Sequence, residues 1–288
     1  MGNWAQLYAD LTAQLQAGQA LGFWDNAFVG FYQSFVAAGR WRLYLNGLLT
    51  TLEATILALL LGVVLGVVVA VIRTAHDQQR AGHKNVILGV FNAICKIYTT
   101  IIRGTPMMVQ SLIFYYAIFN LFKRTGMSVT EINRVWSLFI SGLVTVSLNS
   151  TAYLAEVLRG GILAVDAGQM EAARSLGMTH WQAMRRVVFP QAIKNSLPAI
   201  GNEFIINIKD SSVLCVLGVS DLMFMTRSVA GIYYKGTETY LIAALLYLIL
   251  AYLSSLLLKA IAGRLDSQAP DNSKKRGGVP DWGIPSSN

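Results

Sequence analysis

Five long apolar stretches constrain the fold of this chain more than any other feature. Each of them exceeds the roughly 20 residues that a helix needs to cross a bilayer. They cover residues 43–72, 86–122, 135–165, 189–219 and 240–262. With 54% hydrophobic and only 13% charged residues, the chain is too apolar for an ordinary soluble domain. We therefore predict an all-α polytopic membrane protein with about five transmembrane helices.

The second stretch carries a break in its middle. Arg103-Gly104-Thr105-Pro106 interrupts the apolar residues, and both glycine and proline disfavour a continuous helix there. The stretch is therefore either one interrupted span or two short half-helices whose broken backbone lines a cavity.

Basic residues between the stretches set the orientation. With five spans, thirteen Lys and Arg residues fall on one side and seven on the other. The more basic side faces the cytoplasm, which puts residues 168–190 and the C-terminus inside and the N-terminus outside. Basic loops facing anionic lipid also account for the net charge of +8, so this charge does not call for nucleic acid as a partner.

The two ends of the chain differ from the spanning domain, residues 41–265. In residues 1–40, aromatic and leucine side chains recur at helical spacing and predict one or two interfacial helices. No basic segment precedes a compact apolar core, so a secretory signal is not expected. Residues 266–288 are rich in Pro, Gly, Ser, Asp and Asn and predict a flexible cytoplasmic tail.

Neither cysteine nor histidine spacing indicates a metal site. Cys95 and Cys215 lie within apolar stretches, where buried free thiols are expected. His76, His83 and His180 lie in predicted loops without the spacing of metal ligands.

A stripe of small residues runs along one face of the first span. Ala or Gly recurs every fourth residue, at Ala54, Ala58, Gly62, Gly66 and Ala70. Such a stripe lets two helix backbones approach closely. It is a dimer interface, a sliding surface for conformational change, or a tight contact with another helix of the same subunit. The last interpretation is favoured because the pattern is common in apolar helices.

Ionisable residues inside the stretches are costly, at roughly 2.5 to 3.5 kcal/mol each near the bilayer centre. The candidates are Glu53, Lys96, Arg103, Glu156, Lys209 and Asp210. Arg103 and Glu156 lie near span ends or breaks, where a structural role is as well supported as a ligand role. The tract from Lys209 to Ser212 faces either a cavity or partner, or else marks a helix break held by an internal ion pair.

Residues 168–190 form a charged island between two apolar stretches. Glu171 to Leu176 are helix formers, and Gly177 follows where a helix ends in a left-handed residue. Thr179 and Gln182 have the spacing of a capping box that starts a second helix, and Pro190 forbids its simple continuation. The segment is either a helix pair that docks in a groove of another protein or a plain connector.

The same segment, EAARSLGMTHWQAMRRVVFP, closely resembles the EAA loop of ABC importer permeases. Val187 and Phe189 replace the Ile and Leu of the general pattern but keep its apolar character. Further motifs between residues 46 and 265 resemble the polar amino acid branch of that family. They are Arg103-Gly104-Thr105-Pro106 with Gln110, Ala152-Tyr153-Leu154-Ala155-Glu156 with Arg159-Gly160-Gly161-Ile162, Gly168-Gln169, Phe189-Pro190-Gln191-Ala192 and Lys209-Asp210-Ser211-Ser212.

The resemblance implies the fold of a type I ABC importer permease in a bacterial cytoplasmic membrane. It implies two ABC ATPase subunits, which hold the ATP and Mg, a second permease subunit, identical or a sister, and an extracytoplasmic solute-binding protein that delivers an amino acid. No Gly-x-x-x-x-Gly-Lys-Ser/Thr phosphate loop occurs in the sequence, so no cofactor is expected on this chain and it is not itself an enzyme. The implied ATPase-coupling residues are Glu171, Ala172, Ala173, Gly177 and Pro190.

Polar residues of the spans form a candidate substrate pathway. These are Asn46, Thr50, Glu53, Glu156, Lys209, Asp210, Ser211 and Ser212. Carboxylates suit a cationic amino acid and lysine an acidic one, so the sequence leaves the substrate open. Two rival classes, an ion-coupled transporter or channel and a membrane scaffold, are disfavoured by the docking pattern and by the lack of a visible inverted repeat.

Overall fold

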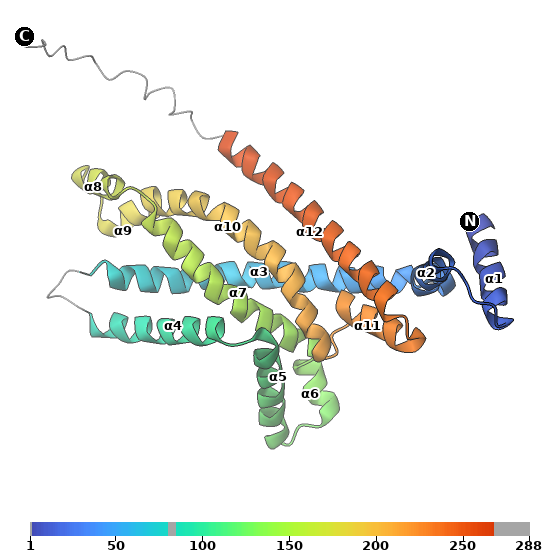
Figure 1. Cartoon of the computed structure of the whole chain (residues 1–288). Coiled ribbons are helices and arrows are strands. Elements are labelled where there is room, and N and C mark those ends of the chain that lie inside the picture. The colour runs from blue at the N-terminus through green and yellow to red at the C-terminus, as the bar shows by residue number, and fades with distance from the viewer. Residues whose placement is uncertain (1, 80–84, 268–288) are drawn as a thin grey trace, which may run out of the picture.

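A computed structural model describes residues 2–79 and 85–267, and in these residues every regular element is a helix (Figure 1). The predicted all-α fold class is confirmed. The α-helices are α1 (Gly2–Gln16), α2 (Phe23–Phe31), α3 (Trp41–Asp77), α4 (Val86–Gly104), α5 (Met107–Arg124), α6 (Val129–Val135), α7 (Leu138–Leu163), α8 (Ala167–Ser175), α9 (His180–Ala183), α10 (Phe189–Asp210), α11 (Leu222–Tyr233) and α12 (Gly236–Ser267). Four short π or 3-10 segments join them, namely η1 (Tyr32–Val36), η2 (Ala37–Gly39), η3 (Met184–Val188) and η4 (Ser211–Val216).

Within the described residues, four helices are long and apolar enough to cross a membrane, rather than the five expected. They are α3, α4, α7 and α12. The fourth predicted span, residues 189–219, became α10, which has 22 residues but is too polar to meet the same standard. Its Glu203 and Asn207 are buried against the rest of the protein, so α10 hides polar groups from its surroundings through packing.

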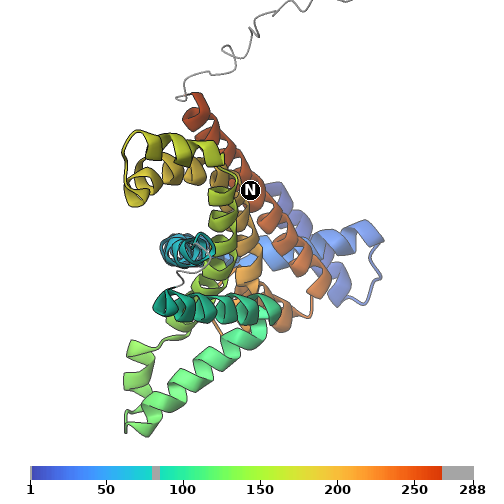
Figure 2. The same ribbon diagram turned by 90° about the vertical axis from the view of Figure 1, so that its left-hand side faces the viewer.

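The break in the second apolar stretch separates two helices of almost equal length. Because α4 alone has 19 residues and qualifies as a span, the half-helix alternative is wrong for it. Pro106 has no N–H for the carbonyl oxygen of Ile102, and the Gln110 side chain donates to that oxygen instead, at 2.7 Å. α5 then turns away, and Figure 2 shows α5 and α6 projecting from the other helices.

The small-residue stripe packs α3 against α7. All five residues of the stripe are buried. A Cβ atom added to Gly62 would lie 2.8 Å from the Cβ atom of Ser150, and one on Gly66 would lie 3.2 Å from the backbone nitrogen of Ala155. The contact lies within one subunit, which confirms the favoured interpretation and makes α3 and α7 the central pair of the fold.

The N-terminal residues form helices, as the spacing of their aromatic side chains predicts. Tyr8 stacks on Tyr32 with ring centroids 4.6 Å apart, which ties α1 to η1. The chain then kinks at Ala38 and Gly39, both in the left-handed region, before α3 begins. The predicted flexible tail lies outside the described residues, apart from its first two positions, which end α12.

Candidate functional site: a helical hairpin and a polar face

α8 and α9 form a hairpin at one end of the molecule, next to the C-terminal end of α3 (Figure 1). Asp166 caps α8 because its Oδ1 atom accepts a hydrogen bond from the backbone N–H of Gly168 at 2.7 Å. Gly177 ends the first helix with φ +84°, the left-handed conformation that favours glycine. The backbone N–H of Met178 closes the turn on the carbonyl oxygen of Ala173 at 3.2 Å. The predicted helix–glycine–helix arrangement is confirmed.

The second helix of the hairpin begins with the predicted capping box. Thr179 Oγ1 accepts a hydrogen bond from the backbone N–H of Gln182 at 3.2 Å. In return, Gln182 Oε1 accepts a hydrogen bond from the backbone N–H of Thr179 at 2.9 Å. The expected break at Pro190 is absent. Helix α9 passes through the π segment η3 into α10, with Phe189 N–H bonding to the Met184 carbonyl and Pro190 in the first turn of α10, where its missing N–H is tolerated.

The hairpin has an inward face and an exposed face. Ala173 and Ala183 are buried, at 4% and 0% exposure, so they hold the two helices in place. Leu176 and Trp181 are large apolar side chains that stay 82% and 63% exposed. Around them, Glu171, Ala172, Arg174, Arg185 and Arg186 are also exposed. This surface combines apolar anchors with a basic rim, the composition of a protein-binding patch.

The hairpin packs against two long helices. Ile162 of α7, Val188 of η3 and Ala192 of α10 form one buried apolar cluster. Met170 and Met184 pack against this cluster from α8 and η3. The hairpin therefore contacts α7 and α10 together through close-packed side chains.

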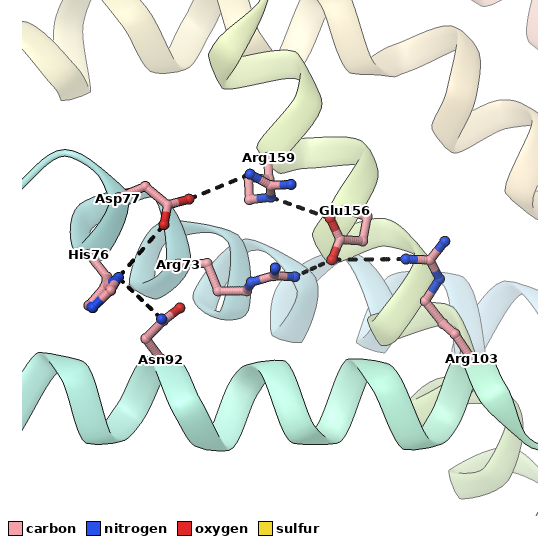
Figure 3. A network of polar contacts seen from close by, with 7 residues as sticks. All are labelled: Arg73, His76, Asp77, Asn92, Arg103, Glu156 and Arg159. Carbon is pink, nitrogen blue, oxygen red and sulfur yellow. Dashed lines mark hydrogen bonds and ion pairs between the residues drawn. The ribbon is translucent and has the colours of Figure 1, made fainter.

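Glu156 lies in a network of charged residues from α3, α4 and α7 (Figure 3). Its carboxylate pairs with Arg73, lies 3.3 Å from Nε of Arg159 and lies 3.9 Å from Nη1 of Arg103. Arg159 also approaches Asp77 at 3.5 Å. Glu156, predicted in the substrate pathway, is thus held by arginines and ties three helices together.

Three other predicted pathway residues share one face of α3. Asn46 and Glu53 are exposed and Thr50 is partly exposed, at the helical spacing that puts them on one side. The hydroxyl of Thr50 donates to the carbonyl oxygen of Asn46 at 3.1 Å. An exposed carboxylate within an apolar span is unfavourable against lipid, so this face requires a polar neighbour.

The tract at the end of α10 divides between surface and interior. Lys209 and Asp210 are exposed, whereas Ser211 is fully buried and bonds to the Ile208 carbonyl oxygen at 3.0 Å. Ser212 is partly exposed in η4, where the α-helix tightens into a 3-10 turn. The helix break is present, but no ion pair within 4 Å joins Lys209 to Asp210 among the residues that the structure describes.

A cavity of about 480 Å³, lined by both polar and apolar residues, lies where α3, α5, α6 and α7 approach the segment after η4. Of the predicted pathway residues only Thr50 lines it. Four polar residues that sequence reasoning missed also line it, namely Tyr115, Asn133, Ser137 and Ser220. Tyr115 lies within α5 and Ser137 caps α7, both inside predicted apolar stretches, whereas Asn133 of α6 and Ser220 lie outside those stretches. A single polar residue at any of these places carries no signal of its own.

The thiols are free, as predicted, with Cys95 buried and Cys215 partly exposed. In residues 2–79 and 85–267 no group of three or more His, Cys, Asp or Glu side chains could hold a metal ion. His76 contacts Asn92, with ring Nδ1 and amide nitrogen 3.1 Å apart, and His83 lies outside the described residues.

Residues 62–267 match the family described as the binding-protein-dependent transport system inner membrane component. The chain is 34% identical over 194 residues to the arginine transport system permease protein ArtQ of Bacillus subtilis (strain 168), covering 63% of this chain and 84% of that relative. It is 31% identical over 176 residues to the glutamine transport system permease protein GlnP of Escherichia coli (strain K12), covering 61% of this chain and 76% of that relative.

Solved structures share the fold. One of an amino acid ABC transporter with histidines superimposes with a TM-score of 0.64 at 38% identity, over 77% of this chain and 94% of that chain. The MetNI methionine ABC transporter, inward facing, gives a TM-score of 0.64 at 21% identity, over 80% of this chain and 99% of that chain, and shows the fold alone.

The chain therefore belongs to the family of binding-protein-dependent transport system inner membrane components. It is a multi-pass membrane protein with the fold of a type I ABC importer permease, and within the family it is a polar amino acid permease. It is a transporter subunit rather than an enzyme, and the ATPase lies in a partner.

Proposed function

We propose that this chain imports a polar amino acid across a bacterial cytoplasmic membrane, driven by two ABC ATPase subunits that bind the α8–α9 hairpin. The exposed pair Leu176 and Trp181 carries the proposal. In water, two such apolar side chains at a hairpin tip are unfavourable, and a groove in a partner protein removes them from solvent. ATP and Mg belong to that partner.

The hairpin turns ATPase movement into movement of the spanning helices. Because the cluster of Ile162, Val188 and Ala192 joins the hairpin to α7 and α10, a rigid-body shift at the hairpin tilts both helices. Closing of the ATPases on ATP favours one orientation of the two helices over the other. Alternation between inward-open and outward-open states follows.

A second permease subunit, identical or a sister, covers the polar face of α3. Asn46, Thr50 and Glu53 are accessible in a single chain and include a charge within a span. A facing permease gives them a polar, water-accessible surface in place of lipid. The amino acid passes between the two subunits along these residues and the exposed Lys209 and Asp210, after an extracytoplasmic solute-binding protein delivers it.

Site-directed cross-linking tests the hairpin contact. In a background with Cys95 and Cys215 replaced by alanine, Leu176→Cys places one thiol at the hairpin tip, and Tyr234→Cys places one at the end of α11 with similar exposure, 82% against 93%. In membranes treated with a short thiol–amine cross-linker, the first variant should capture a protein that carries an ATPase phosphate loop, and the second should not. Equal capture by both variants, or none by Leu176→Cys, contradicts the proposal.

A further inference from the structure

A large apolar hollow lies between the N-terminal helices and α12, away from the hairpin and the polar face. Its volume is about 830 Å³, within the usual range for ligand pockets. Every side chain that lines it is apolar or aromatic. They are Trp4, Ala5, Phe28, Phe31, Tyr32, Phe35, Val36, Leu241, Ile242, Leu245 and Leu246.

The hollow is held open by polar and close-packed contacts around it. Gly30 of α2 lies so close to α12 that an added Cβ would lie 2.8 Å from Cγ of Glu238. Thr239 Oγ1 donates to the buried Ser34 Oγ at 3.4 Å. The Arg40 guanidinium bonds to the Tyr233 hydroxyl and also covers its ring, 4.0 Å from the centroid. The N-terminal segment is thus fixed to the start of α12, so the hollow is a feature of the fold.

The surroundings of the hollow identify its occupant. Leu241 and Leu246 belong to the candidate span Gly236–Ile261, starting roughly 8 Å from its N-terminal end at 1.5 Å per residue. At that depth the hollow meets the hydrocarbon near the bilayer surface. Water does not fill an apolar hollow stably, whereas a hydrocarbon chain does so at no loss of polar contacts.

The polar groups at this end suit a lipid headgroup. Trp24 is 81% exposed in the first turn of α2, the helix whose Phe28 and Phe31 line the hollow, as expected for an aromatic residue at the membrane interface. Arg42 is exposed in the first turn of α3, and none of the ion pairs found among the described residues involves it. Its guanidinium lies 5.4 Å from the centroid of the Trp41 ring and is not paired with a carboxylate of the described residues, so its N–H groups can bind a phosphate.

We propose that the hollow binds one acyl chain of a membrane phospholipid at the end of the molecule where α12 begins. The lining from α1, α2 and η1 precedes the family match, which starts at residue 62. The site goes beyond amino acid import and gives the N-terminal segment a role: the bound chain completes the packing of α1 and α2 on α12.

Photolabelling with a lipid tests the site. The full chain, purified with its partners, is placed in vesicles of phosphatidylcholine and phosphatidylglycerol that contain a phosphatidylcholine with a diazirine on one acyl chain. After irradiation, labelled peptides are mapped by mass spectrometry. Leu245→Trp fills the hollow, and Leu257→Trp is the matched control on the same helix outside it, with exposures of 57% and 61% before substitution.

The expected label concentrates on residues 4–36 and 241–246, several-fold above the rest of α12. Leu245→Trp lowers it several-fold and Leu257→Trp leaves it unchanged. Ala5→Leu narrows the hollow from the side of α1 and should also lower the label, with little effect on α12. Uniform label along α12 or an equal fall in both tryptophan variants overturns the proposal.

Discussion

Replacement of Gly177 separates the local stability of the hairpin from its role in coupling. The residue has φ +84°, and an added Cβ atom meets nothing within 4 Å. The only folded-state penalty of Gly177→Ala is therefore the left-handed conformation, about 1 to 2 kcal/mol. Alanine also lowers the conformational entropy of the unfolded chain, which offsets about 0.4 to 1 kcal/mol of that penalty. The net loss is about 1 kcal/mol, small for a chain of this size.

Gly126 is a matched control on the α5–α6 connection. It has φ +88° and also has open space around its Cβ position. We expect Gly126→Ala and Gly177→Ala to lower the unfolding temperature by the same few degrees. Bulky variants at the two sites should also match in stability, because no heavy atom lies within 4 Å of either Cβ position.

Coupling should distinguish the two sites. In proteoliposomes, the number of ATP molecules hydrolysed per amino acid imported should rise sharply for Gly177→Trp. The reason is that a large side chain at the turn prevents the hairpin from entering the groove of the ATPase. It should stay at the natural value for Gly126→Trp. If both tryptophan variants keep the same ratio, the turn plays no part in coupling and the docking argument is wrong.

Three further substitutions test the fold and the polar face. Glu156→Gln removes the carboxylate charge that faces Arg73 and Arg103, while Arg159 keeps Asp77, and should lower the free energy of unfolding by about 1 to 3 kcal/mol. A double-mutant cycle with Arg73→Gln should show strong coupling if the pair holds α3 to α7. Gly62→Ala should destabilise the protein by about 1 to 3 kcal/mol through overpacking. Gly89→Ala, with open space around its Cβ position, should be neutral or stabilising in thermal melts. Equal shifts in melting temperature for the two variants would contradict the α3–α7 contact. Glu53→Gln should change the rate or amino acid preference of uptake without loss of co-purified ATPase, and unchanged transport removes it from the pathway.

Local signals made the hairpin predictable. Gly177, Thr179 and Gln182 act on their own neighbours through backbone conformation and hydrogen bonds a few residues away. The sequence therefore predicts both helices and the turn between them. The smooth passage through η3 was not predictable in the same way, because a π turn depends on how α10 packs.

Tertiary contacts explain what the sequence did not predict. The partners of Glu156 come from α3, α4 and α7, so no spacing rule brings them together. Gln110 was recognised only as part of a motif, and its bond to the carbonyl oxygen left by Pro106 became clear from the folded break. α10 was counted as an apolar span, yet burial of Glu203 and Asn207 makes it a polar helix that depends on its neighbours.

Uptake by the purified complex tests the central claim most directly. The permease, with the proteins that co-purify, is reconstituted in vesicles with a solute-binding protein, and labelled polar amino acids are supplied on its side. The proposal predicts uptake that requires ATP on the α8–α9 side and no ion gradient. Uptake that follows a proton or sodium gradient, persists without ATP, and occurs with no ATPase in the preparation would contradict it.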